Sequence, residues 1–342
     1  MEILTHALLS LMLARAGQTF LPRYGAAMLI VSGVAADLDF VSYLGGPAAF
    51  LRFHRGMLHS VPCSVVLVCA IALAFWAVAR RHAATNPDSK FCPLSFVEAL
   101  AVCAVGVAAH LLLDLASGIG VQLLWPFRQG WTAWNLLSNL DPWILALLVL
   151  GLLLPMVFRL VSEEIGEREK RPRGQRAAFI TLLLLLIYVG ARAGLHSRAV
   201  DELNSREYRG AAPLATGAFP SALSPFAWRG LVSTDNTIDQ IEISLAPRAG
   251  LDPDRATPHF KPEDSKALEA AENTPAAKTF LQYARFPLAS LERDEEGYRF
   301  ALRDMRFASS DYGAENIIVR VGLSADLRVT RQEFRYANSV AR

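Results

Sequence analysis

Long apolar runs separated by short polar segments fill the first 195 or so residues, whereas the remainder mixes apolar residues with Asp, Glu, Arg and Pro. Crossing a bilayer takes about 20 apolar residues. Five runs approach or reach that length: Tyr24–Leu44, Val61–Ala79, Phe96–Ser117, Trp143–Phe158 and Ala177–Ala191. The N-terminal run Ile3–Ala14 is shorter, so it is a sixth span or a partly inserted helix. A cleaved signal peptide is disfavoured because no basic stretch precedes it. The pattern predicts a mainly α, polytopic membrane helical bundle of about five to six segments over residues 1–197.

The second half follows a different pattern, with short runs rich in β-branched and aromatic residues. Such runs are typical of strands, and we expect them at Ile238–Leu245, Tyr298–Leu302, Ile317–Leu323 and Val329–Tyr336. Ala and Glu dominate Pro262–Ala277, which indicates a helical insert. The sequence therefore predicts a small, antiparallel, β-rich soluble domain over residues 198–342.

Composition narrows the class of protein. Hydrophobic residues make up 53% of the 342 residues and charged residues only 19%, which excludes a generally disordered chain. The formal net charge is +2, so no strong basic field is available and we expect no nucleic acid partner. The four cysteines lie in or beside apolar runs, which excludes a disulfide scaffold.

Lys and Arg positions orient the predicted spans, since basic loops stay in the cytoplasm. The richest loops precede the last span and follow Val61–Ala79; they contain Arg80, Arg81, Lys90, Arg168, Lys170, Arg171, Arg173 and Arg176. Placing these loops inside puts both termini and the C-terminal domain outside the cytoplasm. The unusual polar residues of the first half then collect on the outer face of the membrane.

His110 and Asp114 form the sharpest polar pair within an apolar run. Ionisable residues are costly inside a membrane and usually face protein or a watery cavity. Their i, i+4 spacing places both on one helical face, and His with carboxylate is a good ligand set for zinc or a similar ion. A buried His–Asp hydrogen bond that fixes helix packing is the alternative interpretation.

Asp37 and Asp39 form a second candidate element. At i and i+2 they point to nearly opposite sides of a regular helix, so both reach one site only if the helix ends there. Alternatively, Asp37 binds the ligand while Asp39 caps the helix or orients a partner.

A third element runs from His54 to Ser60. Gly56 permits a turn, so His54 and His59 need not follow helical spacing. Arg55 is either a ligand for an anionic oxygen or an interfacial anchor. Two further residues complete the candidates: His6 in the first apolar segment, and Asp141 before Pro142, which is either an N-cap or a site residue.

These motifs together resemble a known family. Thr5-His6, Ala36-Asp37-Leu38-Asp39, His54-Arg55-Gly56-Met57-Leu58-His59-Ser60, His110-Leu-Leu-Leu-Asp114, Gly120–Phe127 and Asp141-Pro142 occur in the order seen in the YdjM-like inner-membrane proteins, also described as metal-dependent hydrolases. The resemblance covers residues 1 to about 160. The His-x-x-x-Asp helix is also similar to one in zinc-dependent phospholipase C and P1-type nucleases.

The resemblance implies a multi-pass protein of the bacterial inner (cytoplasmic) membrane with one or two divalent ions, zinc first. Carried onto this chain, the implied metal ligands are His6, Asp37, His59, His110 and Asp114. Asp39, Arg55 and His54 are the candidate catalytic residues: Asp39 as general base and Arg55 to steady anionic charge.

We therefore expect hydrolysis of an ester or phosphoester by a metal-activated water, with a membrane lipid or lipid-linked substrate as partner. Two alternatives stay open. One is a non-enzymatic membrane protein with a structural His/Asp or metal cluster and an extracytoplasmic interaction domain. The other is a metal or proton transporter, which is disfavoured because almost no polar residues lie toward the cytoplasmic ends of the spans.

Overall fold

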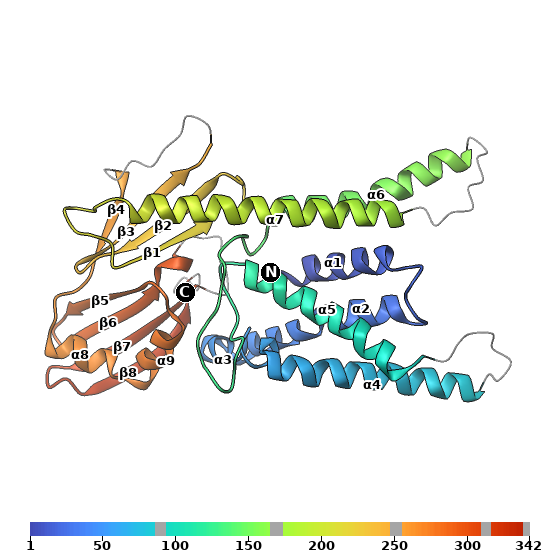
Figure 1. Ribbon diagram of the computed structural model, residues 1–342. Coiled ribbons are helices and arrows are strands. Elements are labelled where there is room, and N and C mark those ends of the chain that lie inside the picture. Colours follow the sequence, from blue (N-terminus) through green and yellow to red (C-terminus); the bar gives the residue numbers. More distant parts are fainter. Residues whose placement is uncertain (86–93, 165–173, 247–254, 309–315, 338–342) are drawn as a thin grey trace. The chain divides into compact units, whose positions relative to one another are not determined.

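The computed structural model describes residues 1–85, 94–164, 174–246, 255–308 and 316–337 (Figure 1). These residues form two compact units. The first comprises residues 1–39, 55–128 and 132–192, and the second comprises residues 40–54, 129–131 and 193–342. Five of the basic residues that oriented the predicted spans lie outside the described residues: Lys90, Arg168, Lys170, Arg171 and Arg173.

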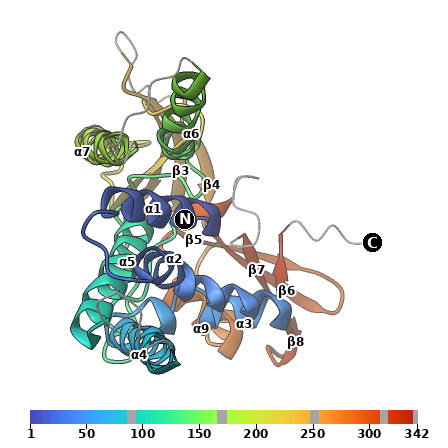
Figure 2. The same cartoon turned by 90° about the vertical axis from the view of Figure 1, so that its right-hand side faces the viewer.

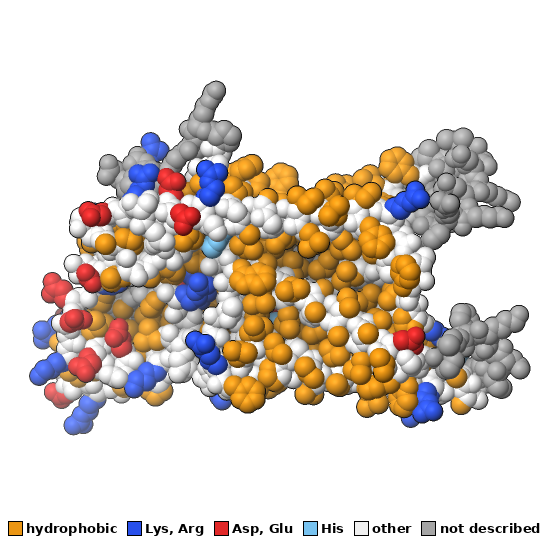
Figure 3. Space-filling view, viewed as in Figure 1, with side chains coloured by type: hydrophobic (Ala, Val, Ile, Leu, Met, Phe, Trp, Pro, Cys, Tyr) orange, Lys and Arg blue, Asp and Glu red, His pale blue; other side chains and the backbone are white. Residues whose placement is uncertain are grey.

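Apolar helices build the first unit, as the sequence predicts. Its elements are α1 (Ile3–Ala16), α2 (Gly25–Val34), the start of the 3-10 helix η1 (Ala35–Gly45), η2 (Met57–His59), α4 (Val61–Thr85), α5 (Phe96–Ala116), α6 (Pro142–Glu164) and most of α7 (Gln175–Asn204). Four described stretches are long and apolar enough to cross a membrane: Gly25–Gly45, Val61–Thr85, Phe96–Ala116 and Gln175–Asn204. Ile3–Ala16 and Pro142–Phe158 are shorter apolar helices. The predicted membrane bundle is confirmed, with hydrophobic side chains over its visible face (Figure 3).

Helix α2 is central in the first unit and packs against α1, α4 and α5 (Figures 1 and 2). Glycines let these helices approach closely. A Cβ at Gly33 of α2 would lie 2.0 Å from Ser10 Oγ, and one at Gly106 of α5 would lie 2.1 Å from Ser32 Oγ. Small residues at helix contacts are a usual means of close packing in membranes, where apolar burial alone gives no driving force.

Capping explains where α5 begins. Ser95 Oγ accepts a hydrogen bond from the Glu98 backbone N–H at 3.1 Å, and Glu98 Oε2 accepts one from the Ser95 N–H at 2.9 Å. This reciprocal arrangement satisfies two amide groups that the first turn would leave unpaired. Glu98 therefore serves the start of the helix, and only His110 and Asp114 remain as unexplained polar residues on α5.

Two four-stranded antiparallel sheets make up most of the second unit. The first has the order β1 (Ala215–Pro220), β2 (Ala227–Ser233), β3 (Thr237–Ser244), β4 (Thr257–Phe260); the second has the order β5 (Pro287–Arg293), β6 (Gly297–Asp304), β7 (Ile317–Ser324), β8 (Val329–Tyr336). Each strand pairs with its sequence neighbour. The short helix α3 (Pro47–Phe53) also belongs to this unit.

The four predicted strands correspond to β3, β6, β7 and β8, and the β-rich fold is confirmed. The predicted helical insert consists of two helices, α8 (Lys266–Glu272) and α9 (Pro275–Tyr283). The break has a local cause, because the Thr274 side chain caps the Ala277 N–H and Pro275 starts a new helix at its first position.

Candidate metal centre

Four separate segments of the first unit bring ionisable side chains together. His6 comes from α1, Asp37 and Asp39 from η1, His59 from η2, and His110 and Asp114 from α5. All six side chains are buried, and Asp114 and His59 are fully so. The structure therefore places side by side the five residues that the sequence singled out as ligands, together with Asp39.

The inner atoms of this cluster are very close to one another. His6, Asp37, His110 and Asp114 each offer one ligand atom, and these four atoms lie within 4.8 Å of one another. His59 belongs to the same cluster, since its Nε2 lies 3.0 Å from His110 Nε2 and 3.1 Å from Asp114 Oδ2. His6 Nε2 is 3.2 Å from Asp114 Oδ1, and its ring stacks on that of His110.

Outer contacts determine which ring nitrogens face inward as acceptors. His110 Nδ1 lies 2.9 Å from the Gly33 carbonyl oxygen. A carbonyl only accepts hydrogen bonds, so Nδ1 carries the proton and Nε2 presents a lone pair to the cluster. His59 Nδ1 lies 3.0 Å from Asp39 Oδ2, and the negative charge of this carboxylate favours the tautomer with its proton on Nδ1. Metal-binding histidines are held by such outer partners in general.

The centre is therefore rich in acceptors. Asp37 Oδ2 and Asp114 Oδ2 are buried and accept no hydrogen bond within the described part of the chain. Two imidazole nitrogens and a carboxylate oxygen about 3 Å apart repel one another unless a cation or a proton lies between them. A mixed nitrogen and carboxylate donor set of this kind fits a zinc-like divalent ion.

Protonation of His59 is the alternative to a cation. Burial lowers the pKa of His59, but its contacts with Asp114 and Asp39 outweigh burial and raise that pKa to about 9. In the metal-free protein His59 then carries the positive charge at neutral pH. A bound ion would take its place, and the His59 proton would leave.

The two aspartates reach the centre because the helix changes there. Regular α-helix ends at Val34, and the 3-10 helix η1 begins at Ala35. Asp37 Oδ1 then lies 3.8 Å from His110 Nε2, while Asp39 Oδ2 accepts the Arg55 backbone N–H at 2.8 Å and contacts His59. Asp39 thus occupies the position of a residue that orients a histidine, which was one of the two sequence-based interpretations.

Arg55 closes one side of the centre with a buried guanidinium. Its Nη2 lies 3.2 Å from Asp114 Oδ1 and donates to the Met1 carbonyl at 3.0 Å, while Nη1 donates to Ser117 Oγ at 3.0 Å. The Arg55 backbone has a φ of 54°, in the left-handed region that residues other than glycine seldom adopt. Its positive charge balances Asp114, which the Met1 amino group also contacts.

Two candidates lie elsewhere. The structure does not bring His54 into the cluster; it belongs to the second unit, where its ring stacks on Phe50 with centroids 4.4 Å apart. Asp141 is the N-cap of α6, because its Oδ1 accepts the backbone N–H groups of Trp143 at 3.1 Å and Ile144 at 3.2 Å. Of the two interpretations of Asp141, these contacts support the N-cap.

Sequence reasoning missed three groups that support the centre. The Gly33 carbonyl orients His110, and Ser117 and Asn139 hold the Arg55 guanidinium, Asn139 Oδ1 accepting from Nη2 at 3.2 Å. Ser117 follows Asp114 by three residues, which is a usable signal. Nothing in the sequence around Gly33 or Asn139 marks either position.

Comparison with known proteins gives one family and one curated relative. The family described as YdjM inner membrane protein matches residues 1–198, more than half of the chain. "Uncharacterized protein YfhP" of Bacillus subtilis (strain 168) is 31% identical over 113 residues, which are 32% of this chain and 30% of that protein. The chain thus matches less than a third of its relative's length. No solved structure matches.

Proposed function

Because the chain belongs to the YdjM inner membrane protein family, we propose that it is a membrane-bound, metal-dependent hydrolase whose ion is held by His6, Asp37, His59, His110 and Asp114. The substrate is an ester or phosphoester, lipid-linked, at the outer face of the membrane. Zinc is the ion that the donor set favours, since imidazole and carboxylate are its usual protein ligands.

A single observation supports this proposal above the others: the inner atoms of the centre are acceptors in need of a cation. The Nε2 atoms of His59 and His110 are 3.0 Å apart, and His59 Nε2 lies 3.1 Å from a buried Asp114 oxygen, so these three atoms need a proton or a cation between them. Burying such a set costs several kcal/mol in a medium of low dielectric constant. A divalent ion offsets that cost and is the usual reason for retaining the arrangement.

Each residue then has a defined task. A bound divalent ion supplies an activated water and polarises the substrate oxygen. Asp39 holds the His59 ring, and the Gly33 carbonyl holds that of His110. The Arg55 guanidinium lies 3.2 Å from Asp114 Oδ1 and balances the charge of that carboxylate beside the centre. Leu38 lies between the two aspartates with 67% of its surface exposed, an apolar contact beside the centre that suits a lipid-linked substrate.

The depth of burial favours a second candidate, a structural ion in a non-enzymatic membrane protein. His6, His59, His110 and Asp114 are each at most 1% exposed. Structural zinc sites are closed by four protein ligands, whereas catalytic sites keep one position for water or substrate. Hydrolysis measurements on the metal-loaded protein therefore separate the two functions.

Metal content is the first test. We expect detergent-purified protein to hold one or two zinc-like ions per chain by mass spectrometry. The His110→Ala, Asp114→Ala double variant removes two ligands and should lose them. The His82→Ala, Asp326→Ala variant removes the same residue types away from the centre and should keep them. Absence of metal from both the wild type and a folded double variant would overturn the proposal.

Activity is the second test. We expect metal-loaded protein to hydrolyse a phosphodiester or carboxylic ester probe, such as bis(p-nitrophenyl) phosphate or p-nitrophenyl butyrate, and a chelator to abolish the reaction. Removing a metal ligand should lower the rate by a factor of about 10³ or more, because a metal supplies several kcal/mol of transition-state stabilisation. Stoichiometric metal without hydrolysis of ester, phosphoester or phospholipid would favour the structural ion.

A further inference from the structure

Alternate residues of the second sheet point to opposite sides, and one side carries an excess of arginine. The buried side includes Phe300, Leu302 and Val319, and helices α8 and α9 pack against strands of this sheet. The other side is exposed at Arg299, Arg303 and Arg320. A strand exposes one face in this way when only the opposite face is packed.

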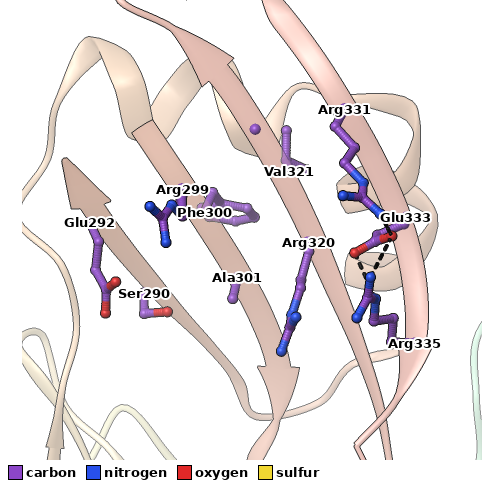
Figure 4. A pocket seen from close by; sticks show the side chains of 11 residues that line it. Ser290, Glu292, Arg299, Phe300, Ala301, Arg320, Val321, Arg331, Glu333 and Arg335 are labelled. Atoms are coloured by element: carbon purple, nitrogen blue, oxygen red, sulfur yellow. Dashed lines mark hydrogen bonds and ion pairs between the residues drawn. The ribbon is translucent and has the colours of Figure 1, made fainter. Parts of the chain in front are cut away.

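Small residues make a hollow in the middle of the exposed face (Figure 4). Ala301 of β6 lies opposite Ser290 of β5 and Arg320 of β7, and Gly322 of β7 lies opposite Arg299 of β6 and Arg331 of β8. The hollow has a volume of about 450 Å³. Long side chains surround a floor of short ones, which is the shape of a shallow ligand site.

The charge around this hollow is positive. Four arginines line it (Arg299, Arg320, Arg331 and Arg335) against two glutamates, Glu292 and Glu333, an excess of two positive charges. Glu333 lies between Arg331 and Arg335 (Figure 4), with its oxygens 2.7 Å from a guanidinium nitrogen of each. Arg299 is paired with Asp294, just outside the hollow. Arg320 is different, because it makes no ion pair with any described residue, although Glu333 lies opposite it on β8.

Guanidinium groups recognise planar or tetrahedral oxyanions through paired hydrogen bonds. Several arginines around one hollow suit a ligand that carries more than one negative charge. Phosphate esters carry one to two negative charges at neutral pH, and their oxygens can accept hydrogen bonds from more than one guanidinium group. Arg303, next to Arg320 on the same face, extends the positive surface along the sheet.

We propose that this exposed face of the β5–β8 sheet is a binding site for a phosphate-bearing ligand, with Arg320 as its central contact. The site is separate from the metal centre and does not depend on hydrolysis. Its residues come entirely from the C-terminal part of the chain, beyond the region that the family match covers.

Binding is tested on the full chain in detergent, with a chelator present so that no metal contributes. Two probes are titrated separately: inorganic pyrophosphate, and a short-chain phosphatidic acid below its micellar concentration. The Arg320→Gln variant should bind about tenfold or more weakly, since it loses hydrogen bonds between a guanidinium and a charged phosphate. The Arg328→Gln variant, in the turn between β7 and β8, is the matched control and should bind like the wild type.

Each result decides the proposal. Pyrophosphate binding that depends on Arg320 supports a soluble phosphate ligand, and binding of the lipid alone supports a phospholipid headgroup. Binding of neither probe, or equal binding by Arg320→Gln and wild type, overturns the site. Because Arg320 makes no described ion pair, the variant should keep the thermal unfolding temperature of the wild type. The metal proposal is unaffected by any of these outcomes.

Discussion

Acceptor groups outside the candidate centre determine which ring nitrogen of each histidine faces the centre. Gly33 gives His110 a carbonyl partner, and Asp39 gives His59 a carboxylate partner. Each imidazole then directs Nε2 to the centre, and the neutral ring has no proton there. Asp39 also accepts the Arg55 backbone N–H, so one carboxylate positions two residues of the η2 segment. We therefore expect Asp39 to position His59 and Arg55.

Removing the charge of Asp39 tests this positional role. The Asp39→Asn variant should bind zinc about 10–100-fold more weakly, because outer partners of metal-binding histidines contribute that much to affinity. Competition with a chromophoric chelator measures the change. Asp141→Asn alters a second buried aspartate that caps α6, and its zinc affinity should match the wild type. Equal affinities for both variants would contradict the role of Asp39.

At the scale of secondary-structure elements, close contacts between helices position the candidate ligands. Gly106 lies one turn before His110 on α5, where a Cβ would meet Ser32 Oγ at 2.1 Å and the Leu29 carbonyl oxygen at 2.9 Å. The second contact is with backbone, which has no rotamer to change. Helices α2 and α5 would have to separate to admit even a methyl group, and η1 with its two aspartates continues directly from α2.

The Gly106→Ala variant should therefore lose both stability and metal affinity. Overpacking of this kind costs about 1–3 kcal/mol, which thermal unfolding in detergent detects. The control is Gly190→Ala in α7, where a new Cβ has nothing within 4 Å. Helix propensity favours Ala over Gly by up to about 1 kcal/mol, so the control should unfold at the same or a higher temperature. Equal behaviour of the two variants would contradict tight packing at Gly106.

Local patterns in the sequence predict the membrane helices, part of the strands and most residues of the candidate metal centre. They do not predict which of these residues come together in the fold. The His110 and Asp114 pair is visible because i, i+4 spacing on an apolar helix fixes their common face. Asp37 and Asp39 depend on where α2 ends, which no capping residue marks. His54 and His59 are ambiguous because Gly56 separates them, and the structure selects His59. Four described strands have no counterpart among the predicted ones: β1, β2, β4 and β5. In β1 and β2, Gly217 and Gly230 interrupt the apolar pattern.

At the scale of the whole molecule, helix α7 runs from the first unit into the second. Its 30 residues span about 45 Å, more than the roughly 30 Å hydrocarbon core of a bilayer. The last turns contribute Ala199 and Leu203 to a core with Trp228 of β2. The first β-sheet is thus packed directly on the end of a candidate membrane span, and the two units share one continuous element.

We expect the C-terminal unit to lie outside the cytoplasm, as the basic loops indicate. With all native cysteines replaced, Glu296→Cys in the exposed turn before β6 should react with an impermeant maleimide in intact spheroplasts. Thr85→Cys, at the exposed end of α4 near Arg80 and Arg81, should react only after lysis. The reverse pattern would place the β-rich unit in the cytoplasm.

The candidate metal centre has a consequence for the protein in a living cell. Its residues come from α1, η1, η2 and α5, so they meet only in the folded bundle, and an ion bound there would stabilise the folded chain by mass action. At a free ion concentration 100 times the Kd, that gain is about 2.7 kcal/mol. When the metal becomes scarce, a larger fraction of the chain should unfold and be degraded. The abundance of this protein would then follow the cell's metal supply, even with transcription unchanged.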